Sequence, residues 1–282
     1  MLRRMKLRHR LAWLPFVALL ASLWAGLPAA QAAEPGAENM LSHRAAYRLK
    51  LDSLRDNASI AQAEGIMLFE VIDACDAWAS RQRFTLLVGD RDGNVIETTS
   101  DYATLEAKDG SSFRFSLTQM TGGAITSRVS GDATITPAGG RIRYQEPAAT
   151  EESLPEGTIL PMIHTLRSLA AARNGQRIFV APLFDGTSAD GAQDTTTIIS
   201  GGWLPPQVNV DFPILSPLHS ARMRIAFFDR NAGGQGGGAA TPDYEVSMRY
   251  FENGVADELK MDFGEFVVDG RLGELQAIPS PC

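Results

Sequence analysis

Apolar and polar residues alternate with a period of two along most of this chain, and this pattern restricts the fold more than any other feature. In residues 113–118, and again in 244–250, every second residue is apolar. Such alternation is typical of strands that bury one face. Turn-forming dipeptides such as Asn253–Gly254 separate the stretches and indicate hairpins. The sequence therefore predicts a mainly β fold, built as an antiparallel meander.

One segment, residues 160–174, has the period of a helix instead. Arg167 and Arg173 fall on one side of it, and its apolar side chains fall on the other: Met162, Ile163, Leu166, Leu169 and Ala170. A single amphipathic helix in a β-rich chain must bury its apolar face against the sheet. We expect it to lie in the concave face of the sheet or to plug an open barrel end.

Residues 1–33 have the pattern of an export signal, and residues 34–282 follow as one domain. Apolar residues 11–26 lead to an Ala-Gln-Ala triplet at 30–32, and they follow a basic start: Arg3, Arg4, Lys6, Arg8 and Arg10. The apolar run is short for a membrane span, which needs about 20 residues. We expect cleavage and a soluble protein of the Gram-negative periplasm with no stable span. A retained N-terminal anchor is the alternative.

The charge of the mature chain argues against two classes of partner. The signal holds five of the 26 Lys and Arg residues and none of the 33 Asp and Glu residues, which leaves 21 against 33, a net charge of −12. An acidic protein gains nothing from releasing phosphate counterions, so we expect no nucleic-acid partner. Simple attraction to anionic lipid headgroups is disfavoured for the same reason.

The chain has two cysteines, Cys75 and Cys282, and almost the whole molecule lies between them. In an oxidising compartment two cysteines allow one disulfide, which would fasten the C-terminus to an early strand. The alternative is a pair of unrelated thiols. A catalytic redox pair is disfavoured because the chain has no Cys-x-x-Cys motif.

The residue types that act in catalysis or bind metals form no recognisable catalytic, metal or cofactor motif. The mature chain has three histidines, His43, His164 and His219, and no Gly-x-Ser-x-Gly turn or His-Glu-x-x-His motif. Residues 90–94 resemble the start of a calcium loop, but Val95 stands where that loop needs glycine, so a hairpin turn explains them better. We expect no catalytic site, no metal and no cofactor.

Four segments together resemble a known family. They are residues 42–49 (SHRAAYRL), 74–78 (ACDAW), 159–175 (ILPMIHTLRSLAAARNG) and 177–186, and a cysteine ends the chain. This arrangement resembles the EipB family of periplasmic cell-envelope integrity proteins from α-proteobacteria, over essentially the whole mature chain.

The resemblance implies a β-spiral, in which one long antiparallel sheet curls like an open barrel around a helix in its concave face. It also implies a disulfide between Cys75 and Cys282 and a role in maintaining the envelope under stress. The family offers no catalytic residues to carry over.

Two hypotheses for function follow. The first is a non-enzymatic protein that binds a hydrophobic ligand, a lipoprotein or peptide, or an envelope partner. Apolar strand faces and the missing catalytic motif favour it. The alternative is a periplasmic hydrolase of envelope material with an unrecognised site near His43 or His219.

Overall fold

The structure is a computed structural model that describes residues 33–56, 58–209, 211–230, 241–280 and 282. Except for its last residue, the predicted export signal lies outside these ranges, and so does most of the glycine-rich loop that precedes Pro242. Residues 32–282 form one compact unit. Within the described ranges, no helix has both the length and the hydropathy that crossing a membrane requires.

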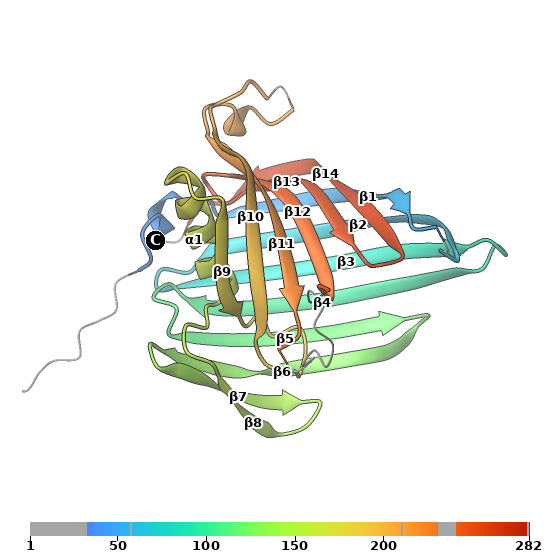
Figure 1. Cartoon of the computed structure of the whole chain (residues 1–282), viewed down its shortest axis with the longest axis horizontal. Helices are drawn as coiled ribbons and strands as arrows, with labels where there is room; N and C mark the ends of the chain where they lie inside the picture. The colour runs from blue at the N-terminus through green and yellow to red at the C-terminus, as the bar shows by residue number, and fades with distance from the viewer. Residues whose placement is uncertain (1–32, 57, 210, 231–240, 281) are drawn as a thin grey trace, which may run out of the picture. The chain divides into compact units, whose positions relative to one another are not determined.

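Fourteen antiparallel strands of these residues form a single sheet (Figure 1). The first meander comprises β1 (His43–Leu54), β2 (Ile60–Asp73), β3 (Ala77–Asp90), β4 (Val95–Ala107), β5 (Ser112–Thr121), β6 (Ala124–Thr136), β7 (Gly139–Glu146) and β8 (Thr150–Leu154). The second comprises β9 (Ile178–Leu183), β10 (Gln193–Leu204), β11 (Ser220–Phe228), β12 (Tyr244–Phe251), β13 (Ala256–Asp262) and β14 (Phe266–Ala277). Strand β1 pairs with β14 and joins the two meanders, which leaves β8 and β9 as the edges.

The sheet is curled, as contacts between residues near its two ends show. Phe184, which follows edge strand β9, contacts Phe113 and Phe115 of β5 with ring centroids 6.0 and 5.2 Å apart. The hydroxyl of Tyr102 on β4 also donates a hydrogen bond to the carbonyl of Asp185. The predicted single, open and curled antiparallel sheet is therefore confirmed.

Helix α1 (Pro161–Arg173) lies against the inner face of the sheet, where it contacts β9 and β10. Residue 161 was expected in its first turn, and proline there suits a helix start. The sequence pattern predicts a narrower buried face than the structure has, because His164, Thr165 and Ser168 are also buried. Only Arg167 and Arg173 are exposed, so the helix is enclosed on nearly all sides.

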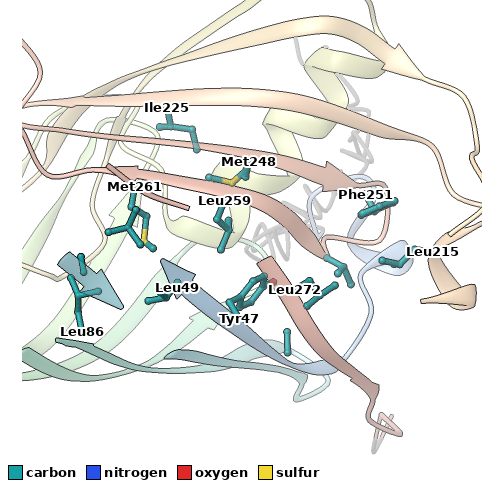
Figure 2. Close-up of a cluster of buried hydrophobic side chains, with 14 residues drawn as sticks. Tyr47, Leu49, Leu86, Leu215, Ile225, Met248, Phe251, Leu259, Met261 and Leu272 are labelled. Carbon is teal, nitrogen blue, oxygen red and sulfur yellow. The ribbon is translucent and has the colours of Figure 1, made fainter. Parts of the chain in front are cut away.

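The largest cluster of buried side chains lies between β1–β3 and β11–β14 (Figure 2). Tyr47 and Leu49 of β1 point into it, and the hydroxyl of Tyr47 donates a 2.8 Å hydrogen bond to the carbonyl of Ala256. Leu215, in the short 3-10 helix η2 (Pro213–Leu215), closes one end of it and has no exposed surface. A second 3-10 helix, η1 (Ala37–Asn39), precedes β1.

Two local features differ from what the sequence pattern indicates. The sequence around Asp269–Gly270 indicates a turn, yet β14 runs straight through it and the chain turns near Gly264, whose φ is 87°. Gly270 is required for close packing, since a Cβ there would lie 3.0 Å from the Cβ of Leu259. Strand β8 was missed because its exposed, acidic residues do not alternate.

Candidate functional site

A hollow of about 500 Å³ lies on the outer face of β14, β1, β2 and β3, opposite the buried core. We call it the outer hollow. It is lined by Arg44, Ala45, Ala46, Leu68, Phe69, Glu70, Arg81, Arg83, Glu274, Leu275 and Gln276. Eight of these eleven residues occupy the strand positions that alternate with core residues, so their side chains lie on the solvent side.

The strand register places the charged side chains of the outer hollow in a row. Arg44 of β1 lies opposite Gln276 of β14 and Glu70 of β2, and Glu70 lies opposite Arg81 of β3. In the next row, Leu68 lies opposite Arg83. Directly opposed side chains on one face are near neighbours, so pairing alone gathers three guanidinium groups around one exposed leucine.

Two of these arginines already have partners. Arg44 forms an ion pair with Glu70, and Arg83 forms one with Asp101 at 2.8 Å. The arginine side chains are 63% and 56% exposed, so water screens both pairs. Exposed ion pairs contribute about 0–1 kcal/mol to stability, and an incoming anion can compete with them at little cost.

Arg81 differs from its neighbours, because it makes no ion pair or side-chain hydrogen bond within the residues that the structure describes. Leu68 beside it is 46% exposed. A guanidinium group presents a planar set of donors that matches a carboxylate or a phosphate. The outer hollow therefore combines a free anion-binding group with an apolar surface.

A second hollow of about 420 Å³ continues across β3, β4 and β5 and shares Glu70 and Arg81 with the first. Half of its outer-face lining is small or hydroxylated, including Ala103, Ser116 and Thr118. The two hollows together form a surface that crosses six neighbouring strands.

The inner face holds its charged groups differently. Glu106 of β4 is 1% exposed, and its two carboxylate oxygens accept hydrogen bonds of 2.9 and 3.0 Å from the backbone N–H groups of Met162 and Ile163. These N–H groups belong to the first turn of α1, where helical donors have no partner within the helix. Burial raises the pKa of Glu106 to about 8, against the opposing effect of the two hydrogen bonds. Glu106 therefore fastens the helix to the sheet.

None of the three histidines lines either hollow. His43 is buried, with its Nδ1 atom 2.7 Å from the carbonyl of Leu41, and burial lowers its pKa. His219 stacks on Trp203 with ring centroids 5.7 Å apart, and its Nδ1 atom lies 3.9 Å from a carboxylate oxygen of Glu252. In the described residues, neither ring bonds to a hydroxyl or a thiol.

His164 does bond to a hydroxyl, since its Nε2 atom lies 3.1 Å from the Oγ1 atom of Thr197. Both residues are buried, at 4% and 0% exposure, and neither lines a hollow described above. Burial lowers the pKa of His164 to about 4. This pair joins α1 to β10 inside the core, where no substrate reaches it.

Cys75 and Cys282 are joined by a disulfide, with Cα atoms 5.4 Å apart and a sequence separation of 207. Cys75 lies in the turn between β2 and β3, and both cysteines are exposed. The bond fastens the C-terminus beside the start of β1, where Ile278 also donates a backbone hydrogen bond to Ser42. Neither cysteine lines either hollow.

Residues 90–94 form the hairpin turn between β3 and β4. The carboxylate of Asp90 accepts hydrogen bonds from the backbone N–H groups of Asp92 and Asn94. Across the described ranges, no three potential metal ligands are gathered together.

The outer-hollow residues were not singled out from the sequence. They come from the consecutive strands β1, β2 and β3 and from the distant strand β14, and the pairing of β1 with both β2 and β14 brings the two parts together. The sequence contains only a weak signal for them, since Arg44, Arg81 and Arg83 each occupy a solvent-facing position of an alternating strand.

Comparisons with known proteins agree on one family. The family model described as EipB-like matches residues 34–279. The cell envelope integrity protein EipB of Brucella abortus (strain 2308) is 27% identical over 256 residues, which are 90% of this chain and 89% of that protein. The crystal structure of a β-barrel-like protein of domain of unknown function DUF1849 from Brucella abortus superposes with a TM-score of 0.75 and 25% identity, over 85% of this chain and 99% of that one.

Proposed function

This chain belongs to the EipB-like family, and from that premise we propose that it supports cell-envelope integrity in the Gram-negative periplasm as a binding protein and not as an enzyme. Its relative from Brucella abortus is named for envelope integrity. An export-type N-terminus supports the location, and the acidic mature chain fits a soluble protein.

The outer hollow is the proposed binding site. The observation that carries this assignment is the guanidinium group of Arg81, which pairs with no described residue, beside the exposed side chain of Leu68, in a hollow of about 500 Å³. A ligand that matches both has an acidic group next to an apolar segment, as acyl chains and envelope peptides do. The concave face remains a predicted site for a ligand, but α1 and the hydrophobic clusters occupy much of it.

Binding is tested with dodecanoate and its neutral analogue dodecanol, titrated into the mature protein while amide chemical shifts are followed by NMR. We expect dodecanoate to shift the amides of β1 to β3 around Arg81 and dodecanol to bind at least tenfold more weakly. Native mass spectrometry of protein extracted from the periplasm should show an acidic amphiphile bound. Shifts confined to the inner face, with the outer hollow unchanged, would overturn the assignment of the site.

A hydrolase is the alternative, and no contact of the described residues favours it over binding. It requires a nucleophile in contact with His43 or His219, and their ring nitrogens lie beside a carbonyl and a carboxylate. Replacing His219 by Asn leaves the core intact, because that ring is at the surface. Loss of the envelope phenotype in this variant, together with cleavage of an ester or peptidoglycan substrate by the wild type, would establish the alternative.

A further inference from the structure

The two edges of the open sheet are protected to different degrees. Edge strand β8 is short and carries Glu151, which pairs with Arg141 and Arg143 of β7 at 2.8 and 3.0 Å. Charged side chains of this kind discourage another chain from pairing with an edge. Edge strand β9 has no charged residue between Ile178 and Leu183.

Backbone hydrogen bonds show which groups of β9 face away from the sheet. The N–H group of Ile199 donates to the carbonyl of Arg177 at 2.8 Å, so odd-numbered residues of β9 bond to β10. Even-numbered residues point outward. Among them, the carbonyl of Pro182 already accepts a 2.9 Å bond from Ile159, whose own carbonyl accepts one from Phe184.

The N–H and C=O groups of Ile178 and Val180 therefore point outward, and they have no hydrogen-bond partner among the described residues. Ile159 forms an isolated bridge with Leu183 of β9, so the protein itself already places one extended residue against this edge. The edge therefore accepts an extended chain. At Pro161 the chain turns into α1 and leaves the rest of the edge open.

The side chains beside these groups are apolar and exposed. Ile178 and Val180 are 60% and 63% exposed, and Ile198 of β10, directly opposite Ile178, is 45% exposed. β-Branched residues at a free edge favour further strand pairing. We infer that the free edge of β9 is a docking site for an extended segment of another protein, which adds to the sheet as a further strand.

The chemistry of that segment follows from its surroundings. Its backbone supplies the missing hydrogen bonds, and its apolar side chains extend the row formed by Ile178 and Ile198. Arg177 at the open end is exposed and has no ion-pair partner in the part of the chain that is described, so an acidic residue suits that end. This surface is separate from the outer hollow, and it does not depend on a ligand there.

A second copy of this chain fits the edge less well. An antiparallel pair of β9 strands would bring residues 174–176 of each copy, which lead out of α1, toward the position that Ile159 of the other copy holds. The open edge presents two residues, far too few for the 1,200 Å² or so that a stable interface between folded proteins buries.

The test uses the mature protein and an N-acetylated octapeptide that alternates valine and threonine and ends in glutamate. Hydrogen exchange followed by NMR reports the amides of Ile178 and Val180, and fluorescence anisotropy reports affinity. We expect the peptide to slow exchange at both amides, and an N-methylated version of it, which lacks alternate donors, to bind at least tenfold more weakly.

Variants at one position make the test specific. Val180→Pro removes the outward donor and no bond to β10, and proline is tolerated where an edge N–H faces solvent; we expect at least tenfold weaker binding. Val180→Thr keeps the donor and the branched shape and should bind as the wild type does. If the proline variant fails to fold, Val180→Lys replaces it, with Val95→Lys as the control at a similarly exposed valine away from this edge.

Two outcomes overturn the inference. One is binding that is equal in the wild type and the Val180 variants, or that leaves exchange at Ile178 and Val180 unchanged at millimolar peptide. The other is a dimer in analytical ultracentrifugation that protects the same two amides, which would make the occupant a second copy.

Discussion

The inner and outer faces of the sheet hold their charged groups in opposite ways. On the inner face, Glu106 is buried and both of its oxygens accept backbone hydrogen bonds from α1. On the outer face, Arg44 and Arg83 form exposed ion pairs, and Arg81 forms none within the described residues. A buried polar group destabilises the fold unless its hydrogen bonds are made, whereas an exposed charge is free to exchange partners.

The difference separates stability from binding. Substitutions on the inner face should lower the free energy of unfolding, because they leave buried donors without acceptors. Substitutions in the outer hollow should leave unfolding nearly unchanged and alter affinity for an acidic ligand.

The largest effect is expected for Glu106→Leu. It removes the acceptor for two buried N–H groups of α1, and each unsatisfied donor costs about 1–3 kcal/mol, so we expect a loss of about 3–5 kcal/mol in the free energy of unfolding. Urea denaturation followed by circular dichroism measures it. A loss below about 1 kcal/mol would show that Glu106 does not fasten the helix.

Removing the disulfide between Cys75 and Cys282 should have the second largest effect on stability. For a closed loop spanning 207 residues, the chain-entropy model gives an upper value of about 5 kcal/mol, and native disulfides commonly contribute about 2–4 kcal/mol. We expect Cys282→Ser to lower the free energy of unfolding by that smaller amount and to keep dodecanoate binding at low temperature. Identical melting of the oxidised and reduced proteins would contradict a structural role for the bond.

The pH dependence of stability isolates Glu106 from the histidines. The folded pKa of Glu106 is raised to about 8, above its ordinary value of 4.5, so the folded state holds a proton that the unfolded state releases between these values, and stability falls as pH rises. His164, with its pKa lowered to about 4, has the opposite effect, but only below its ordinary value of 6.5.

Between pH 6.5 and 8 the unfolded histidines lose only their remaining protons, so Glu106 contributes most of the change in stability among these groups. We expect the wild type to lose about 2 kcal/mol relative to Glu106→Gln across this window, since one pKa unit corresponds to about 1.4 kcal/mol. Glu106→Gln, which does not titrate at this position, should show a nearly flat profile in urea melts over the same window. Parallel profiles for the two proteins would contradict a raised pKa at this position.

The sequence predicts the fold better than it predicts the sites. Period-two alternation and the single helical segment are local patterns, so the strands, α1 and the antiparallel arrangement could be anticipated. The same rule fails around Leu105 and Glu106, where it would bury the leucine; in the structure Leu105 is 41% exposed and Glu106 is enclosed. A tertiary contact with α1 decides which of the two turns inward.

The outer hollow could not be predicted from local sequence patterns, for a different reason. Its row of charges depends on the registers in which β1, β2 and β3 pair, and its fourth strand, β14, is more than two hundred residues away; no spacing in the sequence predicts either. The open edge at β9 was likewise invisible, because a strand can be assigned from its residues, but its position in the sheet cannot.

The smallest effect on stability, and the most direct test of the outer face, is expected for Arg81→Gln. Its side chain is exposed and makes no ion pair with a described residue, so the free energy of unfolding should change by less than about 0.5 kcal/mol. Affinity for dodecanoate should fall about tenfold, because a charge-assisted hydrogen bond contributes about 1.5–3 kcal/mol. Isothermal titration calorimetry measures it.

Arg114→Gln is the matched control for this variant. Arg114 lies on the same outer face, is 73% exposed and pairs with Asp132 at 2.9 Å, but it does not line either hollow. Both substitutions remove one positive charge, so a general electrostatic effect would weaken binding equally in the two variants. A loss confined to Arg81→Gln would instead place the acidic group of the ligand beside Arg81. Unchanged affinity in both variants would show that the outer hollow is not the binding site and would favour the concave face instead.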